Sequence, residues 1–330
     1  MGARPSFPIV QIPRDRIAVV TGGNTGLGYE IAKWLAMMGA TVIIGCRSEQ
    51  RAVEAIERMN KEYQQMKEEF GDKHQLQTYD SLAVSFMPLD LGSFKSTLQF
   101  VDEFKKSGRN LHILVCNAGI GMAPYEKTID GFEKMLQVNY LSHFLMVAKL
   151  LPVMRKSGPD CRILFMSSDA HRACSFDVET MNYEGNASKF GRLDYYGRSK
   201  LYQIMQMYSL ARRFKDTNVS INSSHPGIVD TEINRNFQDS FFWSVIFFKG
   251  SKLLGKLKSP IDGASSIINA AVNPELAGVS GRYYYNCTDG NHTSTSRDVN
   301  KQEALWKQTM EYLKDYITDE ERDVLENISS

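Results

Sequence analysis

Short runs of consecutive apolar residues alternate along this chain with longer segments in which apolar residues recur every three or four positions. A continuous apolar run is typical of a strand buried on both faces of a parallel sheet, and the longer period is typical of a helix packed on it. The predicted strands cover residues 16–22, 41–46, 84–91, 111–119, 162–168, 218–225 and 280–286. The predicted helices cover residues 29–39, 48–71, 93–106, 128–157, 193–215 and 260–272. This alternation predicts an α/β fold with a parallel sheet.

Several segments do not follow this alternation. Residues 1–15 contain three Pro and form a loose arm, and residues 291–330 read as a polar helical tail. Residues 71–82 are polar and aperiodic, which predicts a surface insertion, and residues 169–192 read as an exposed loop. No repeat or linker divides residues 16–290, so we expect a single domain there.

The first predicted strand runs into a glycine-rich turn, Thr21-Gly-Gly-Asn-Thr-Gly-Leu-Gly28. A helix and a second strand follow, which together make a βαβ unit. Side chains in place of the glycines would hold a diphosphate away from the backbone amides and the helix N-terminus that bind it. A purely structural turn is the alternative interpretation. The expected dinucleotide-binding residues of this turn are Gly22, Asn24, Gly26, Leu27 and Gly28.

The end of the second predicted strand indicates which dinucleotide binds. An acidic residue there selects NAD, whereas a basic residue accommodates the 2′-phosphate of NADP. The chain has Arg47 between Cys46 and Ser48, which favours NADP(H) and leaves NAD(H) open; an exposed loop arginine is the alternative. At the end of the third strand, Asp90 is placed to reach the adenine, with Leu91 beside it.

Tyr196 and Lys200 are four residues apart in a predicted helix, so their side chains share one face. A phenol titrates near a pKa of about 10, and a neighbouring cation is expected to lower that value towards the range useful for acid–base catalysis. A solvated helix face is the alternative interpretation. The pair indicates catalysis only if the rest of the chain supplies a cofactor site and a group that binds the substrate oxygen.

Other strand ends place small or polar residues at the carboxyl edge, where open parallel sheets bind ligands. Asn117, Ala118 and Gly119 are suited to a cofactor lying against the sheet. Ser168 ends the fifth strand, and Asn139 is a polar residue within an apolar helix, where it must find partners. Further along the chain come Pro226, Gly227 and Thr231.

Composition narrows the class of protein. The 330 residues carry a formal net charge of +1, which argues against nucleic acid as the main partner. The five Cys are scattered without a C-x-x-C pair, so no metal site is indicated and a reducing compartment is expected. No apolar stretch is long enough to span a membrane. The start Met-Gly-Ala-Arg-Pro-Ser fits an acylation pattern at Gly2, which stays open.

Residues 237–258 combine the aromatic run Phe241–Phe248 with Lys249, Lys252, Lys256 and Lys258. An apolar face bordered by Lys is what an interfacial helix needs. A helix packed on its own domain or a subunit interface is the equal alternative. We expect residues 230–258 to form a substrate lid, which makes a small helical substrate-binding extension of the domain.

Taken together, the ordered motifs resemble the short-chain dehydrogenase/reductase family over residues 14–290. Within it, the chain is most similar to the branch of retinol dehydrogenases, WW-domain oxidoreductases and X-linked dehydrogenase/reductases. That narrower resemblance rests on Cys46-Arg47, Asn139-Tyr-Leu-x-His-Phe, Ser168-Asp-Ala-His171 and Gly281-Arg-Tyr-Tyr-Tyr-Asn. The resemblance implies a Rossmann-type doubly wound parallel sheet.

The resemblance also implies roles for individual residues. Tyr196 would exchange a proton with the substrate oxygen, and Lys200 would lower the pKa of Tyr196 and bind the nicotinamide ribose. Ser168, rather than its neighbour Ser167, would stabilise the substrate oxygen, and Asn139 would hold a water. Thr231 and the backbone beside Gly227 would seat the nicotinamide amide.

The function expected from all of this is NADP(H)-dependent hydride transfer to or from a lipophilic alcohol or carbonyl such as a retinoid, polyprenoid or steroid. A reductase for small xenobiotic carbonyls or quinones, and a low-turnover NADP(H)-sensing protein, are the alternatives. We expect a cytoplasmic protein, with peripheral attachment to the endoplasmic reticulum or a lipid droplet and homodimer formation as open alternatives.

Overall fold

The computed structural model describes residues 6–70, 76, 79–229 and 257–326. Gly2, the aromatic run Phe241–Phe248 and most of the expected lid therefore lie outside the described residues.

A mostly parallel sheet forms the centre of the molecule, and within the described residues its strand order is β3-β2-β1-β4-β5-β6-β7-β8. Only the β7–β8 pair is antiparallel. The chain leaves β1 on one side for β2 and β3 and later returns on the other side for β4, so a crevice opens above the carboxyl ends of β1 and β4. The strands are β1 Ile17–Thr21, β2 Thr41–Cys46, β3 Val84–Pro88, β4 Ile113–Cys116, β5 Cys161–Met166, β6 Val219–Ser224, β7 Tyr283–Tyr285 and β8 Thr288–Asp289.

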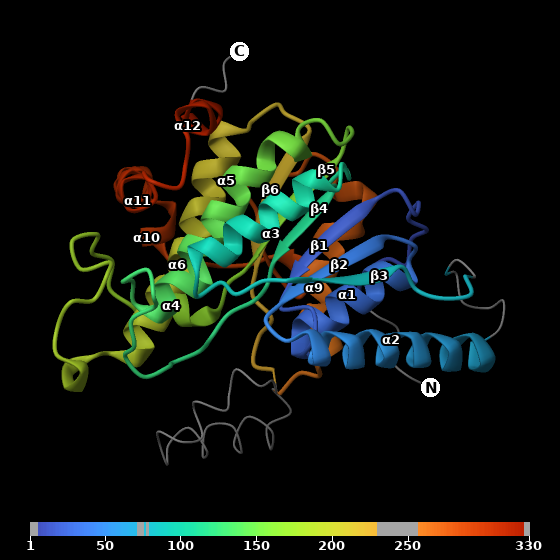
Figure 1. Ribbon diagram of the computed structural model, residues 1–330. Helices are drawn as coiled ribbons and strands as arrows, with labels where there is room; N and C mark the ends of the chain where they lie inside the picture. Colours follow the sequence, from blue (N-terminus) through green and yellow to red (C-terminus); the bar gives the residue numbers. More distant parts are fainter. Residues whose placement is uncertain (1–5, 71–75, 77–78, 230–256, 327–330) are drawn as a thin grey trace.

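Helices cover both faces of this sheet (Figure 1), which confirms the doubly wound architecture. Helices α1 and α9 pack together on one face, with α2 beside α1, and α3, α5 and α6 cover the other. The helices are α1 Gly26–Met37, α2 Glu49–Phe70, α3 Phe94–Lys106, α4 Lys134–Leu136, α5 Ser142–Met154, α6 Arg192–Arg213, α9 Pro260–Val272, α10 Ser294–Arg297, α11 Val299–Tyr312 and α12 Asp319–Glu326. In the described residues, no helix is long and apolar enough to cross a membrane.

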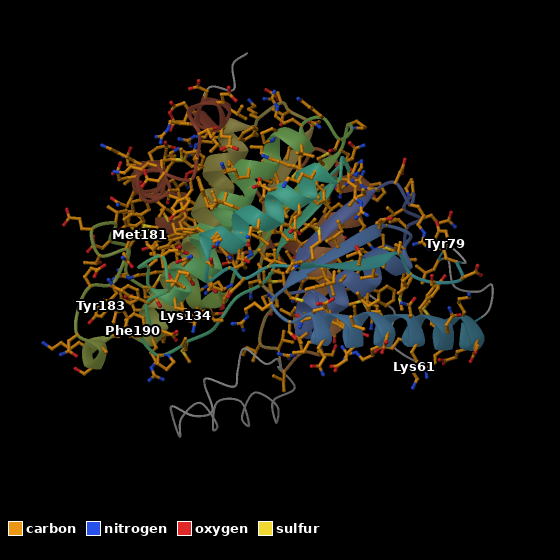
Figure 2. The ribbon with its side chains drawn as sticks, in the orientation of Figure 1. Lys61, Tyr79, Lys134, Met181, Tyr183 and Phe190 are labelled. Atoms are coloured by element: carbon orange, nitrogen blue, oxygen red, sulfur yellow. The ribbon has the colours of Figure 1, made fainter. Side chains whose placement is uncertain are left out.

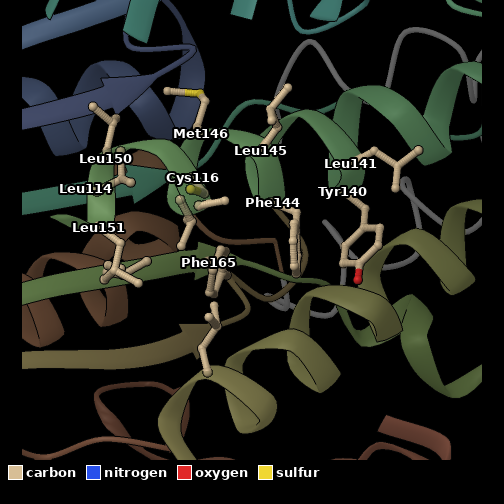
Figure 3. Packing of buried hydrophobic residues seen from close by; sticks show 14 of the residues in the cluster. Leu114, Cys116, Tyr140, Leu141, Phe144, Leu145, Met146, Leu150, Leu151 and Phe165 are labelled. Carbon is tan, nitrogen blue, oxygen red and sulfur yellow. The ribbon is translucent and has the colours of Figure 1, made fainter. Parts of the chain in front are cut away.

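The larger apolar core lies between the sheet and the α3, α5 and α6 face. Figure 3 shows Leu114, Cys116 and Phe165 of the sheet facing residues of α5 such as Phe144. The expected polar tail contributes to this core, because Trp306 of α11 lies edge-on to Phe144 with ring centroids 5.1 Å apart. The tail is therefore amphipathic, and its buried apolar residues are Leu305, Trp306, Met310, Leu313, Ile317 and Leu325.

The single helix expected over residues 128–157 is wrong. Lys127 and Glu133 form an antiparallel bridge, and the helix begins only at Lys134, where both carboxylate oxygens of Glu133 accept from main-chain N–H groups. A π-helical turn over Gln137–Leu141 then interrupts the α-helical pattern before α5. Such insertions are frequent at functional sites, and this one carries Asn139.

The segment expected as an exposed loop, residues 169–192, is partly packed into the protein. His171 and Met181 are each only 1% exposed. The rings of Tyr183 and Phe190 lie 5.1 Å apart and cluster beside the start of α6 (Figure 2). Residues 169–172 form a short 3₁₀ turn, which matters for the site described next.

Candidate active site

A cleft of about 1320 Å³ runs along the carboxyl edge of the sheet. Among the described residues, its lining includes every residue that the sequence singled out for a cofactor or catalytic role except Asn139, and Thr231 lies outside the described residues. The cleft has two ends. We call the part around the glycine turn and Arg47 the nucleotide end, and the part around Ser168, Tyr196 and Lys200 the catalytic end.

The nucleotide end is built mainly from backbone. Gly22 and Gly26 have φ values of 67° and 55°, in the left-handed region that favours glycine. A Cβ on Gly28 would lie 2.2 Å from the carbonyl oxygen of Gly22, so no side chain fits there. Thr25 precedes α1 without capping it, and the first turn of α1 carries no acidic residue. Within the described residues, the helix N-terminus thus presents N–H groups without a side-chain cap to the cleft, which is what binding of a diphosphate requires.

Hydrogen bonds to Thr21 hold the strand ends behind this turn together. The Thr21 hydroxyl accepts from the main-chain N–H groups of Asn117 and Ala118, each at 2.9 Å. The Asn117 side chain donates to the Thr21 carbonyl at 2.9 Å. Asn117 therefore ties the ends of β1 and β4 together, and the small residues that follow keep the edge open.

Cationic side chains flank the cleft just beyond β2. Arg47 is exposed and lines the cleft, as the sequence suggested, together with Ser48 and Arg51. Arg51 was missed, although it lies four residues after Arg47 and close to the N-terminus of α2. Asp90 lies on the same side of the cleft, where its carboxylate accepts from the Gly92 N–H at 2.9 Å.

The catalytic end brings Ser168 and Tyr196 into contact. The Ser168 hydroxyl lies close enough to the Tyr196 phenol, which lies in α6 and is 7% exposed, to lower the pKa of that phenol. The next residue, Gly197, makes this contact possible, because a Cβ there would lie 2.6 Å from the carbonyl oxygen of Ala170. Only glycine at this position lets α6 approach the turn that carries Ser168.

Ser167 and Ser168 face different surroundings, which supports the choice between them. The Ser167 hydroxyl is buried and donates to the main-chain carbonyl of Lys200 at 2.8 Å. It thus ties β5 to α6. Ser168 is left as the serine whose hydroxyl meets Tyr196.

Burial dominates the electrostatics of the Tyr196–Lys200 pair. The Lys200 amine is 5.9 Å from the Tyr196 ring centroid, is 2% exposed and donates to the carbonyl oxygen of Met166 at 2.9 Å. Burial lowers the pKa of Lys200 to about 7. Burial raises the pKa of Tyr196, and the Ser168 hydroxyl works against that rise. Lys200 is not among the groups that shift the pKa of Tyr196 in the protein alone, so its expected effect on Tyr196 stays a prediction.

Asn139 connects the π-helical turn to the catalytic end. Its side-chain amide donates to Ser199 at 2.9 Å and to the Ile120 carbonyl at 3.0 Å, and it accepts from the Ile120 N–H at 2.8 Å. A Cβ on Gly119 would lie 3.1 Å from the Asn139 side chain and 3.3 Å from the Lys200 amine. Asn139 thus fixes the segment after β4 against α6. That it holds a water stays a prediction.

His143 extends this network towards the nucleotide end. Its Nδ1 lies 3.2 Å from the Asn139 carbonyl oxygen, which can only accept, so Nδ1 carries the hydrogen. Its Nε2 then accepts from the Thr21 hydroxyl at 2.9 Å. Burial lowers the pKa of His143 to about 4, which keeps the ring neutral. Thr21 and His143 were not predicted as site residues, because nothing in the sequence around either residue links the two.

The far wall of the catalytic end is formed by the turn after β6. Gly227 has φ of 81°, and its N–H donates to His225 Nδ1 at 3.0 Å. Lys258 packs along this turn, donates to the Asn286 side chain and lies 4.6 Å from the Tyr285 ring centroid. This lysine, expected on an interfacial helix face, instead lines the cleft. The other three lysines of that pattern lie outside the described residues.

The donor set of the cleft fits a nicotinamide dinucleotide. It combines an uncapped helix N-terminus, a turn without room for side chains, cations beyond β2 and a buried phenol–amine pair. Over the part of the chain that is described, no group of three metal-ligating side chains could hold a metal ion.

Known proteins resemble this chain over most of its length. The family model described as short chain dehydrogenase matches residues 16–240. Human retinol dehydrogenase 14 is 35% identical over 291 residues, covering 88% of this chain and 84% of the relative. Human polyprenol dehydrogenase is 35% identical over 315 residues, covering 93% and 87%. The solved structure titled Pseudomonas aeruginosa RhlG/NADP active-site complex matches with a TM-score of 0.60 and 24% identity, covering 84% of this chain and 96% of that one.

Proposed function

Because the chain belongs to the short-chain dehydrogenase/reductase family and is an oxidoreductase acting on an alcohol or carbonyl, we propose that it transfers a hydride between NADP(H) and a lipophilic substrate. The observation that carries this proposal is the contact between Ser168 and Tyr196 beside the buried Lys200, at the end of a cleft that fits a dinucleotide.

The proposed mechanism assigns proton handling to the catalytic end. The bound nicotinamide supplies or accepts the hydride. The Ser168 and Tyr196 hydroxyls, which lie beside each other, both bind the substrate oxygen, and Tyr196 gives it a proton in reduction or removes one in oxidation. Lys200 has a pKa of about 7, so near neutral pH it can pass a proton towards Tyr196 and bind ribose hydroxyls. Asn139 keeps the segment after β4 in place.

The preference for NADP(H) over NAD(H) is supported by charge. Arg47 and Arg51 both line the cleft beyond β2, where a 2′-phosphate would lie. The strand end Gly45-Cys46-Arg47-Ser48 contains no carboxylate that could bind the ribose hydroxyls of NAD. Two guanidinium groups would bind a 2′-phosphate through charge-assisted hydrogen bonds, whereas they would add little to the binding free energy of an unmodified ribose.

The lipophilic substrate is supported by apolar side chains at the cleft. Ile129 and Leu193 are 83% and 47% exposed, yet both line the cleft. Two of the relatives are named for long apolar alcohols, retinol and polyprenol. An apolar chain that covers these two side chains would remove their surface from water.

The test follows NADPH absorbance with a series of aldehydes of increasing chain length. We expect KM to fall as the chain lengthens, and the double variant Ile129→Ser, Leu193→Ser to lose most of that trend while keeping its rate with short aldehydes. Val53→Ser and Val299→Ser are matched controls, since these residues are 46% and 51% exposed but do not line the cleft. A flat dependence on chain length in the wild type would contradict the lipophilic assignment.

A further inference from the structure

The turn that carries Ser168 is shaped by a buried histidine. We call Ser168–Arg172 the serine turn; its last four residues form the 3₁₀ turn after β5. His171 is 1% exposed, and its Nδ1 lies 2.6 Å from the main-chain carbonyl oxygen of Ser168. Since a carbonyl only accepts, Nδ1 carries the hydrogen and donates it. The His171 N–H donates to the same oxygen at 3.1 Å, so two donors from one residue fix the Ser168 peptide group.

The serine turn is enclosed on two sides. On one side it packs on α6, where Gly197 leaves no room between the helix and the Ala170 carbonyl. On the other side the His171 ring lies edge-on to Tyr283 of β7, with centroids 5.5 Å apart. The imidazole therefore fills the space between the turn and the sheet and at the same time makes its hydrogen bond to Ser168.

The His171 ring is suited to this task only when it is neutral. Its Nε2 is buried and has no hydrogen-bond partner among the described residues, so an added proton there would be left unpaired. Burial lowers the pKa of His171, with Arg172 adding to the effect and Asp169 opposing it. The other groups that face the ring are Tyr283 of β7, His225 after β6 and His292 before α10.

We propose that His171 is a positioning residue for Ser168: its Nδ1–H fixes the Ser168 peptide so that the serine hydroxyl meets the Tyr196 phenol and the substrate oxygen. This proposal rests on the function proposed above, in which Ser168 binds that oxygen. His171 itself touches neither substrate nor cofactor. It acts on the reaction by fixing the orientation of the Ser168 hydroxyl towards Tyr196 and the substrate oxygen.

Two polar substitutions separate this role from a merely structural one. In His171→Asn the side-chain amide reaches the position of Nδ1 and can still donate to the Ser168 carbonyl. In His171→Gln the amide reaches the position of Nε2 and cannot. We expect the Asn variant to keep kcat within about threefold of wild type and the Gln variant to lose about tenfold or more, with the NADPH dissociation constant unchanged in both. His292→Gln is the matched control, because His292 also lies 5.5 Å from Tyr283 but does not contact Ser168.

A double-mutant cycle with Ser168→Ala completes the test. If His171 acts through Ser168, His171→Gln should cost little further rate once the serine hydroxyl is gone. The Asn variant should also lose any decline of kcat at acidic pH that arises from protonation of His171. Equal losses in the Asn and Gln variants, or the same loss from His171→Gln with and without Ser168, would overturn the proposal. The wild-type rate with the same aldehyde tests the proposed function separately.

Discussion

The two ends of the cleft are built in opposite ways. At the nucleotide end the functional groups are main-chain N–H groups and exposed arginines from two short stretches, residues 22–28 and 47–51. At the catalytic end they are side chains from distant segments, of which Asn139, Lys200 and Tyr196 are 0%, 2% and 7% exposed. An anionic group such as a diphosphate can be bound by the backbone of one short segment. Proton transfer instead needs groups desolvated by the whole fold.

The two ends also differ in the free-energy penalty that their charged groups impose on folding. The arginines of the nucleotide end stay in water, where a charge carries little penalty. The Lys200 amine of the catalytic end is buried, and its pKa falls to about 7. Changes at the nucleotide end should therefore act on cofactor affinity, and changes at the catalytic end on turnover and stability.

The largest effect is expected from Gly28→Ala at the nucleotide end. The added Cβ would lie 2.2 Å from the Gly22 carbonyl oxygen and force the turn apart, so NADPH affinity should fall about 100-fold or more. Fluorescence titration with NADPH measures this loss. Gly191→Ala is the control, because a Cβ there meets only Asp194 at an ordinary 3.5 Å and Gly191 does not line the cleft. Tight NADPH binding by Gly28→Ala would contradict the claim that main-chain groups of the glycine turn bind the cofactor.

Gly197→Ala should produce the next largest effect, at the catalytic end. Its Cβ would lie 2.6 Å from the Ala170 carbonyl oxygen and push the serine turn away from Tyr196. We expect kcat to fall by about 10- to 100-fold while the NADPH dissociation constant stays unchanged. Steady-state kinetics and titration measure the two quantities. Gly191→Ala is the control, since a Cβ there meets only Asp194 at an ordinary 3.5 Å; equal losses of kcat in both variants would count against the positioning argument.

Arg47→Glu should change cofactor choice by a smaller factor. Charge reversal removes a cation from the expected 2′-phosphate site, so the KM for NADPH should rise about tenfold while that for NADH changes little. Arg109→Glu changes the net charge equally, and Arg109 is exposed and does not line the cleft. An equal effect of Arg47→Glu on both cofactors would remove the argument for NADP(H).

Lys200→Met should abolish turnover yet stabilise the cofactor-free protein. Burial lowers the pKa of this amine from 10.5 to about 7, so at pH 7 the wild type loses up to about 4 kcal/mol of unfolding free energy. Because the pKa is lowered on folding, the penalty is largest below pH 7 and shrinks as pH rises towards 10.5. Denaturant unfolding of both proteins at pH 7 and pH 9.5 measures it. If the free energy of unfolding of the variant at pH 7 is no higher than that of the wild type, burial of the Lys200 amine does not carry the penalty assigned to it.

Much of the fold follows from local pattern. The strand over residues 41–46 and the helix over residues 260–272 have the predicted bounds, since a continuous apolar run and a Pro-started helix carry their own signals. The residues of the glycine turn at the nucleotide end could also be predicted from the sequence, because they are neighbours in it. Tyr196 and Lys200 could be paired from helical spacing alone.

What could not be predicted depends on contacts between distant segments. The π-helical turn carries Asn139, whose side chain bonds to Ser199, 60 residues away. Gly197 is needed only because the serine turn packs on α6, and Trp306 is buried only because α11 reaches Phe144. The raised pKa of Tyr196 likewise depends on how many distant side chains exclude water from it.

The central claim is that the Tyr196 phenol transfers the proton to or from the substrate oxygen, and that NADPH binding at the nucleotide end does not depend on this phenol. Replacing Tyr196 with Phe removes only the hydroxyl, so the NADPH dissociation constant from fluorescence titration should stay within about twofold. The rate of NADPH oxidation with the best long-chain aldehyde should fall by about 10²- to 10⁴-fold. A Tyr196→Phe enzyme that binds NADPH and keeps the wild-type rate would contradict the claim.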